Sequence, residues 1–151
     1  MVSLSSQSKK LGEKMSNMQS WKQNVGSIID YAERIFPEVE IVTRSLSGEI
    51  VKSNYGQVAK RAKKLGSALE SYGIKHGQNV GSLALNTYRN MEMYYGISGM
   101  GAVMHTINFR LHPEQVVYII NHAENRIIFL ETVFAPLLEA IQANCPTVEQ
   151  Y

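Results

Sequence analysis

The sequence predicts an α/β protein with a doubly wound parallel sheet, and three observations carry this prediction. The apolar runs 80–85, 102–107 and 126–131 lack the period-two alternation of a half-exposed strand. Segments with apolar residues at helical spacing separate these runs. Strands that alternate with helices in this way form a parallel sheet covered on both faces and joined by right-handed crossovers. The predicted order is βαβαβα, preceded by one helix and a β-hairpin.

The chain is predicted to begin with a flexible leader over residues 1–19. This segment is rich in Ser, Lys and Gln and has no sustained apolar periodicity. Met15 and Met18 leave the natural start open. From Trp21 onward apolar residues recur at helical spacing, which predicts a helix that ends near Pro37.

A β-hairpin and a long helix are predicted next. The runs 41–43 and 50–52 are β-prone, and a Ser-Gly turn separates them. The following helix has Asn54 as a candidate N-cap, with Gln57 in the position of a capping-box partner. Gly73 follows this helix in the position of a C-terminal cap.

This helix carries a basic run on the face opposite its apolar residues. Two interpretations are open: an ordinary solvated helix surface, or a patch that binds phosphate or a membrane surface. The run consists of Lys60, Arg61, Lys63 and Lys64.

Three further helices separate and follow the strands. They are predicted over residues 86–101, over 112–124 with Pro113 at the first helical position, and over 132–145 with Thr132 as the cap. The last residues, "PTVEQY", resemble the approach to another strand. Because three parallel strands make a small sheet with an exposed edge, the pattern indicates the opening of a larger protein.

Composition limits the function classes. A length of 151 residues suits one domain, and a net charge of +2 gives no basic field for nucleic acid. The lone Cys145 cannot form an internal disulfide, which fits a reducing compartment. The longest apolar run, 116–120, is far too short to span a membrane, and no signal peptide is recognisable. We therefore expect a cytoplasmic protein.

The residues alone give no catalytic set. Neither a P-loop nor a G-x-S-x-G elbow is present, and "GISGMG" lacks the spacing and context of a dinucleotide fingerprint. Its glycines are interpreted as small residues that let a helix and a strand approach closely. Four histidines, 76, 105, 112 and 122, show no metal-ligand spacing, and Asp30 is the only aspartate. No metal site is predicted.

Two stretches resemble the N-terminal part of the adenylate-forming acyl-CoA synthetases. They are "GMGAVMHTINFRLHPEQ" and "YIINHAENRIIF", where the family typically has G-M-G-A-V-L-H-T-L-N-P-R-L-x-P-E-Q and Y-I-x-N-H-A-E-D. The likeness extends from about Gln19 to Tyr151 and is greatest to medium- and long-chain fatty-acid–CoA ligases and methylmercaptopropionate–CoA ligases. Two positions depart from the pattern: Gly56, which costs a helix about 0.5–1 kcal/mol relative to Ala, and Phe109, where the family more often has Pro.

The resemblance implies an enzyme that joins a fatty acid, or a short thioether carboxylate, to coenzyme A through an acyl-adenylate. It implies ATP, Mg²⁺ and coenzyme A as cofactors and a homodimer to which residues 21–36 contribute. Residues 20–151 would then be the N-terminal portion of an adenylation domain that stops before the phosphate loop. We expect this portion to be inactive and to bind none of the cofactors tightly. The alternative is a non-catalytic binding or dimerisation module built on the same scaffold.

Arg110 is the one candidate ligand-binding residue. It follows the carboxyl end of the strand 102–107, the edge at which α/β sheets bind ligands. The resemblance places its loop on the side where the nucleotide of coenzyme A approaches, and a guanidinium suits a phosphate. A structural salt bridge, for example to Glu114, is the competing interpretation.

Overall fold

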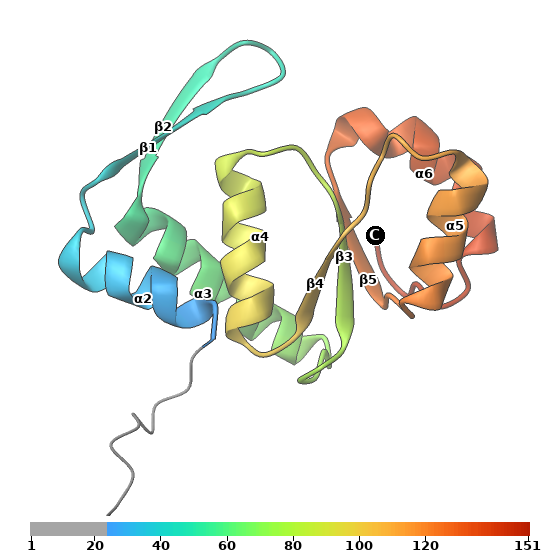
Figure 1. The fold of residues 1–151 in the computed structure, drawn as a ribbon, viewed down its shortest axis with the longest axis horizontal. Coiled ribbons are helices and arrows are strands. Elements are labelled where there is room, and N and C mark those ends of the chain that lie inside the picture. Colours follow the sequence, from blue (N-terminus) through green and yellow to red (C-terminus); the bar gives the residue numbers. More distant parts are fainter. Residues whose placement is uncertain (1–23) are drawn as a thin grey trace, which may run out of the picture.

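The computed structural model describes residues 24–151 and shows the predicted doubly wound α/β fold (Figure 1). Strands β3 (Asn79–Leu83), β4 (Val103–Thr106) and β5 (Ile127–Leu130) form a parallel sheet in the order β4-β3-β5. The predicted leader, residues 1–19, and Trp21 lie outside the described residues.

Helices cover both faces of this sheet (Figure 1). On one face α3 (Tyr55–Ser71) and α4 (Tyr88–Gly99) pack on a core that includes Val80 and Ile127. On the other face α5 (Pro113–His122) and α6 (Ala135–Ile141) pack on a core that includes Leu83 and Ile128. Consecutive residues of β5 thus enter opposite cores, which explains why the strand lacks polar alternation.

Cys145 is buried in the core beneath α5 and α6. Burial raises the pKa of its thiol above the usual value, because an apolar environment disfavours the thiolate. The side chain therefore behaves as a small apolar group in this half of the domain.

The predicted N-terminal helix and hairpin are confirmed. Helix α2 (Gly26–Ile35) ends just before Phe36, and Ile29 packs against α3. Strands β1 (Glu40–Arg44) and β2 (Ile50–Asn54) pair in antiparallel fashion, and Gly48 takes a left-handed conformation in the turn, with φ of 86°.

The ends of α3 match their predicted caps except in one bond. The Asn54 side chain accepts a hydrogen bond from the Gln57 N–H at 2.8 Å, and Gly73 has the predicted left-handed conformation. The prediction that the Gln57 side chain accepts a return hydrogen bond from the Asn54 N–H is wrong. Because Asn54 also closes the β1–β2 ladder, Gln57 Oε1 instead accepts from the hydroxyl of Ser53 at 3.1 Å.

The last predicted helix, 132–145, is interrupted, and the expected Thr132 cap is wrong. Residues Thr132–Phe134 form a 3-10 turn without a side-chain cap, and the α-helix runs only over Ala135–Ile141 before a second 3-10 turn. Pro136 accounts for the late start, because a proline without an N–H is tolerated only in the first turn of a helix.

The interpretation of "PTVEQY" as the approach to a strand is supported by a parallel bridge between Gln150 and Ile127. The segment is held beside β5 by a two-pronged ion pair, in which Arg126 Nε and Nη2 each lie 2.7 Å from a carboxylate oxygen of Glu149. Hydrogen bonds from Arg126 hold the pKa of Glu149 below its usual value.

Two glycines of "GISGMG", Gly96 and Gly99, lie where helices approach each other, whereas Gly101 takes a left-handed conformation beside the His76 ring in the turn before β4. A Cβ at Gly96 would lie 2.7 Å from the backbone oxygen of Ala62, and a Cβ at Gly26 would lie 2.9 Å from the Cα of Gly99. Gly96 on α4 and Gly26 on α2 are therefore the positions at which only glycine leaves room.

Half of the basic run on α3 forms ion pairs between helices. Arg61 Nε lies 2.6 Å from Glu92 Oε1 on α4, and Lys63 pairs with Asp30 at 3.1 Å and with Glu33, both on α2. Both side chains remain exposed, at 60% and 55%, as expected for a solvated helix surface, although each also pairs with a neighbouring helix. A patch that binds phosphate or a membrane surface is the alternative interpretation. Arg61 and Lys63 are already paired with carboxylates, so they contribute less free positive charge to such a patch.

Replacing Gly96 by Ala should destabilise the fold by about 1–3 kcal/mol, the usual cost of adding atoms to a close-packed contact. Gly96→Ala is compared with Gly99→Ala in urea unfolding. A Cβ at Gly99 would lie at an ordinary 3.7 Å from the Cα of Gly26 on the neighbouring helix, so this control should unfold at the wild-type midpoint or above. Equal midpoints for the two variants would show that the α3–α4 approach does not limit stability.

Candidate functional site

The chain adds β4 on one side of β3 and β5 on the other, so the order of the strands reverses at β3. The candidate site lies at this reversal. The chain leaves β3 toward α4 on one face and leaves β5 toward α6 on the other. The loops after β3 and β5 therefore diverge, and such a crevice at the carboxyl ends of strands is where open α/β sheets bind ligands.

A cleft of about 670 Å³ opens at this crevice. Its floor includes Phe129 and Leu130 of β5, and the β1–β2 hairpin forms the opposite wall. Apolar side chains and a polar rim make the cleft suitable for a group with both characters. The residues that line it are Thr43, Ser45, Leu46, Glu49, Val51, Ala84, Thr87, Tyr88, Arg89, Met93, Phe129, Leu130, Glu131 and Thr132.

Glu131 joins the two loops of the crevice. Its Oε1 atom accepts a hydrogen bond from the N–H of Leu85 at 3.2 Å and lies 3.5 Å from the hydroxyl of Thr87. The Glu131 N–H in turn donates to the carbonyl of Leu83 at 3.0 Å. This residue thus continues the β3–β5 ladder with its backbone and fixes the β3–α4 loop with its side chain.

The hairpin caps the helix beside the cleft. Helix α4 begins after Thr87, whose own side chain makes no capping bond. Instead the buried hydroxyl of Thr43, on β1, accepts from the Tyr88 N–H at 3.1 Å. A cap from a separate element satisfies one free N–H of the helix and also holds the hairpin against it.

Arg89 is the cation on the rim of the cleft. Its guanidinium lies 5.7 Å from the centre of the Tyr88 ring, and its Nε donates to the Tyr88 hydroxyl at 3.1 Å. The hydrogen bond to Tyr88 raises the pKa of Arg89 above its usual value. The residues that line the cleft include no histidine or cysteine.

The structure places Arg110 away from this cleft. Its loop follows β4, an edge strand, and Phe109 anchors the loop by packing on Phe134 at 4.7 Å between ring centres. The exposed guanidinium of Arg110 lies 5.5 Å from the centre of the Phe109 ring. The expected salt bridge to Glu114 is wrong, because Arg110 has no ion pair within residues 24–151 and Glu114 lies 4.0 Å from His112 Nδ1.

The four histidines lie apart from any metal site. His105 Nδ1 contacts the buried Asn125 amide at 2.8 Å. Across the described part of the chain, no group of three His, Cys, Asp or Glu side chains could hold a metal ion. No helix there has the length and apolar character needed to cross a bilayer.

Sequence reasoning did not identify Thr43, Arg89 or Glu131. The rule that selected Arg110 also applies to Glu131, because Glu131 directly follows a parallel strand. The role of Thr43 has no local signal, because its partner is 45 residues away.

Comparisons with known proteins agree with this fold and extend it. Residues 31–150 match the model of the family described as AMP-binding enzyme. The 3-methylmercaptopropionyl-CoA ligase of Ruegeria pomeroyi is 45% identical over 126 residues, which is 83% of this chain and 23% of that protein. The long-chain-fatty-acid–CoA ligase of Thermus thermophilus is 35% identical over 144 residues, which is 93% of this chain and 27% of that protein.

Among solved structures, an anthranilate CoA ligase in complex with anthranoyl-AMP superposes with a TM-score of 0.76 at 26% identity. The match covers 84% of this chain and 24% of that one. The chain thus spans about a quarter of the length of the proteins it resembles.

Proposed function

Because the chain belongs to the AMP-binding enzyme family, we propose that it is the N-terminal part of an acyl-CoA ligase that acts on a fatty acid or on 3-methylmercaptopropionate. The observation that carries this proposal is the identity of 42% and 45% to two 3-methylmercaptopropionyl-CoA ligases, each over more than four-fifths of the chain. In the proposed reaction the carboxylate attacks the α-phosphate of ATP and releases pyrophosphate. The thiol of coenzyme A then displaces AMP and forms the thioester.

Residues 24–151 supply scaffold and positioning in this proposal. The cleft lining lacks a nucleophile with its base, and the described residues lack a carboxylate cluster for Mg²⁺. We assign the phosphate loop and the groups that would hold Mg²⁺ to residues beyond Tyr151. The cytoplasm is the proposed location, and carboxylate, ATP and coenzyme A are the proposed partners, with no nucleic acid.

A non-catalytic module on the same scaffold is the second candidate, favoured by the absence of a catalytic set from the described residues. The two candidates differ in what the longer gene product does.

The product of the reading frame that contains this sequence should release pyrophosphate from ATP when given a fatty acid or 3-methylmercaptopropionate, and should form the thioester with coenzyme A. The 151-residue chain alone should show no turnover above a blank, because the groups that stabilise charge in the transition state are not among its described residues. A longer product without activity would favour the non-catalytic module. Turnover by the 151-residue chain would contradict our assignment of the chemistry.

We further propose that Arg110 binds a phosphate of coenzyme A. Its guanidinium is exposed at the carboxyl-end edge of the sheet and has no carboxylate partner among residues 24–151. Packing of Phe109 on Phe134 fixes the loop that carries it. A held, unpaired guanidinium on a fixed loop fits a phosphate group.

In the ligase, Arg110→Ala should raise the KM for coenzyme A about 10- to 150-fold, which corresponds to the loss of a charge-assisted hydrogen bond of about 1.5–3 kcal/mol. Pyrophosphate release in the adenylation half-reaction and the melting temperature should stay near wild type. Arg110→Lys keeps the charge without the planar fork, so its KM should fall between the two. Unchanged thioester kinetics in both variants would remove Arg110 from the site.

A homodimer is proposed through the outer face of α2. Three of its apolar side chains occupy one face at helical spacing and are about half exposed: Ile28 at 58%, Tyr31 at 51% and Ile35 at 48%. The Tyr31 ring also packs edge-on against Phe36, which widens the apolar surface. An apolar row of this kind is typical of an interaction surface, and a second copy offers a matching one.

Light scattering should find the ligase as a dimer at micromolar concentration, and Tyr31→Glu should convert it to a monomer by placing a charge in the interface. Tyr118→Glu is the matched control, because Tyr118 is an exposed tyrosine on α5, at 65%. A wild-type monomer, or a dimer that survives Tyr31→Glu, would contradict the proposal.

A further inference from the structure

The basic run on α3 meets a further cation across the contact with α4. Arg61 and Lys64 are three residues apart, so they lie on the same side of α3. Together with Arg89, near the start of α4, they line a groove of about 360 Å³ between the two helices. Each helix contributes residues at positions i, i+3 and i+4, which form one continuous side of a helix. The other residues that line the groove are Leu65, Glu92 and Met93.

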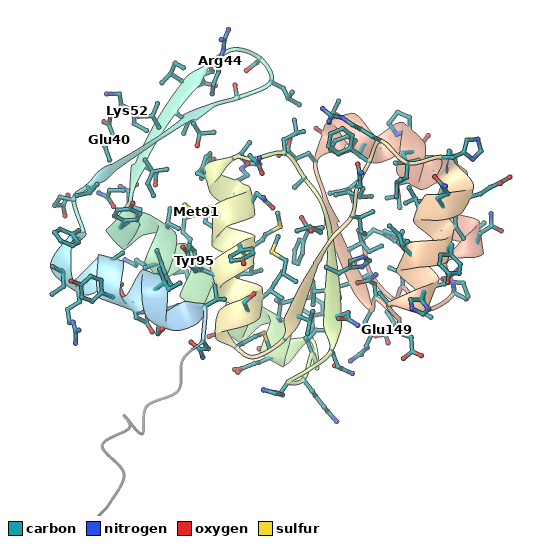
Figure 2. All side chains as sticks on the ribbon, in the orientation of Figure 1. Glu40, Arg44, Lys52, Met91, Tyr95 and Glu149 are labelled. Atoms are coloured by element: carbon teal, nitrogen blue, oxygen red, sulfur yellow. The ribbon has the colours of Figure 1, made fainter. Side chains whose placement is uncertain are left out.

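This groove has an apolar floor and a basic rim. Leu65 and Met93 pack against the core under α3 and α4. Another side of α4 carries Met91 and Tyr95, which pack against the core formed with α2 (Figure 2). The three cations of the groove are exposed, so they stand at its rim, above packed apolar side chains.

The positive charges of the groove exceed the negative charges by two. Arg61 Nε pairs with the buried carboxylate of Glu92 at 2.6 Å, and its two terminal nitrogens make no hydrogen bond to residues 24–151. Within the same residues Lys64 forms no ion pair, and Arg89 donates only to the hydroxyl of Tyr88. Two cations therefore remain beside one ion pair.

Several cations elsewhere on the surface are neutralised by a neighbour. Lys52 lies 3.0 Å from Glu40 across the hairpin, and Arg126 holds both carboxylate oxygens of Glu149 (Lys52, Glu40 and Glu149 are labelled in Figure 2). In the groove between α3 and α4, three like charges gather around a single carboxylate. They repel one another, and a bound anion would relieve this repulsion.

We propose that this groove binds a phosphate group with two negative charges, either as inorganic phosphate or at the end of a phosphomonoester. Lys64 and Arg89 supply the two charges that the anion neutralises, and the terminal nitrogens of Arg61 supply further donors. Guanidinium groups match phosphate oxygens with paired donors, and an ammonium adds a point charge. A phosphomonoester is mostly a dianion at neutral pH, whereas a carboxylate would neutralise only one of the two charges. Glu92 has the separate role of holding Arg61 in place.

The groove lies beside the cleft at the crevice, because Arg89 and Met93 line both. Arg110, for which we propose a phosphate of coenzyme A, does not line the groove. The two phosphate sites can therefore be tested separately. The groove does not rest on the proposed function, since all its residues belong to α3 and α4 and its test requires no turnover.

Isothermal titration of inorganic phosphate into the 151-residue chain, in a chloride buffer at physiological ionic strength, tests the proposal. Saturable binding is expected in the millimolar range. Lys64→Gln should raise the Kd about 5-fold, a modest factor because the cations of the groove are exposed to solvent. Lys60→Gln is the matched control, because it makes the same charge change one turn earlier on α3, outside the groove, and it should keep the wild-type Kd.

The absence of saturable binding, or equal Kd values for Lys64→Gln and Lys60→Gln, would overturn the proposal. Binding that is lost in Arg110→Ala and kept in Lys64→Gln would also overturn it, because the phosphate would then lie at the other site. Arg89→Gln gives an independent variant on the opposite helix and should raise the Kd by a similar factor. Circular dichroism of each variant checks that it is folded.

A vesicle assay distinguishes the two sources of the phosphate group. Phosphatidylcholine vesicles that contain phosphatidic acid are compared with vesicles of phosphatidylcholine alone. Binding to the former that is weakened in Lys64→Gln and kept in Lys60→Gln would support a lipid headgroup as the ligand. Binding of inorganic phosphate without vesicle binding would support a soluble phosphate or phosphomonoester.

Discussion

The close approach of α4 to α3 is the constraint on which the rest of the structure depends. At Gly96 the backbones come so near that a methyl group would meet the Ala62 carbonyl oxygen at 2.7 Å. This approach lets Glu92, which is buried, reach Arg61 on the neighbouring helix. At its other end, the first turn of α4 meets β1, where the Thr43 hydroxyl caps Tyr88. Core packing, the α3–α4 ion pair and the wall of the cleft all depend on this pair of helices, which can approach closely because Gly96 has no side chain.

The topology of this protein could be predicted from its sequence because its signals are local. Strands with unbroken apolar runs require burial on both faces. Asn54 and Gly73 mark the start and the end of α3, and Pro113 marks the start of α5. The errors arise where a neighbouring residue has a second role that changes the local bonding. Gln57 turns to Ser53 because Asn54 belongs to a strand, and Thr132 is displaced as a cap because Pro136 moves the start of α6. Which helices the glycines of "GISGMG" would meet also depended on tertiary structure, because only the spacing was visible.

The candidate site was likewise predictable from the sequence only in part. The rule that ligands gather at the carboxyl ends of parallel strands leads to Arg110 by sequence alone, but strand order decides which loops border the crevice. Strands β4 and β5 both flank β3, but the cleft is lined by the loops after β3 and β5 and not by the loop after β4. Glu131 and Arg89 thus belong to one region, and Arg110 to another that α6 supports through Phe134. The carboxyl-end edge of the sheet therefore carries two separate polar regions, one around Glu131 and Arg89 and one around Arg110.

The burial of Cys145 gives this protein an internal chemical reporter. It is the only thiol in the sequence. It lies in the core under α5 and α6, and the thiolate that reacts with alkylating reagents is suppressed there. Alkylation of Cys145 therefore requires that half of the domain to open. The α3–α4 half contains no cysteine, so its opening does not lead to modification. The rate at which an alkylating reagent modifies the native protein is thus a measure of how often one face of the sheet is uncovered independently of the other.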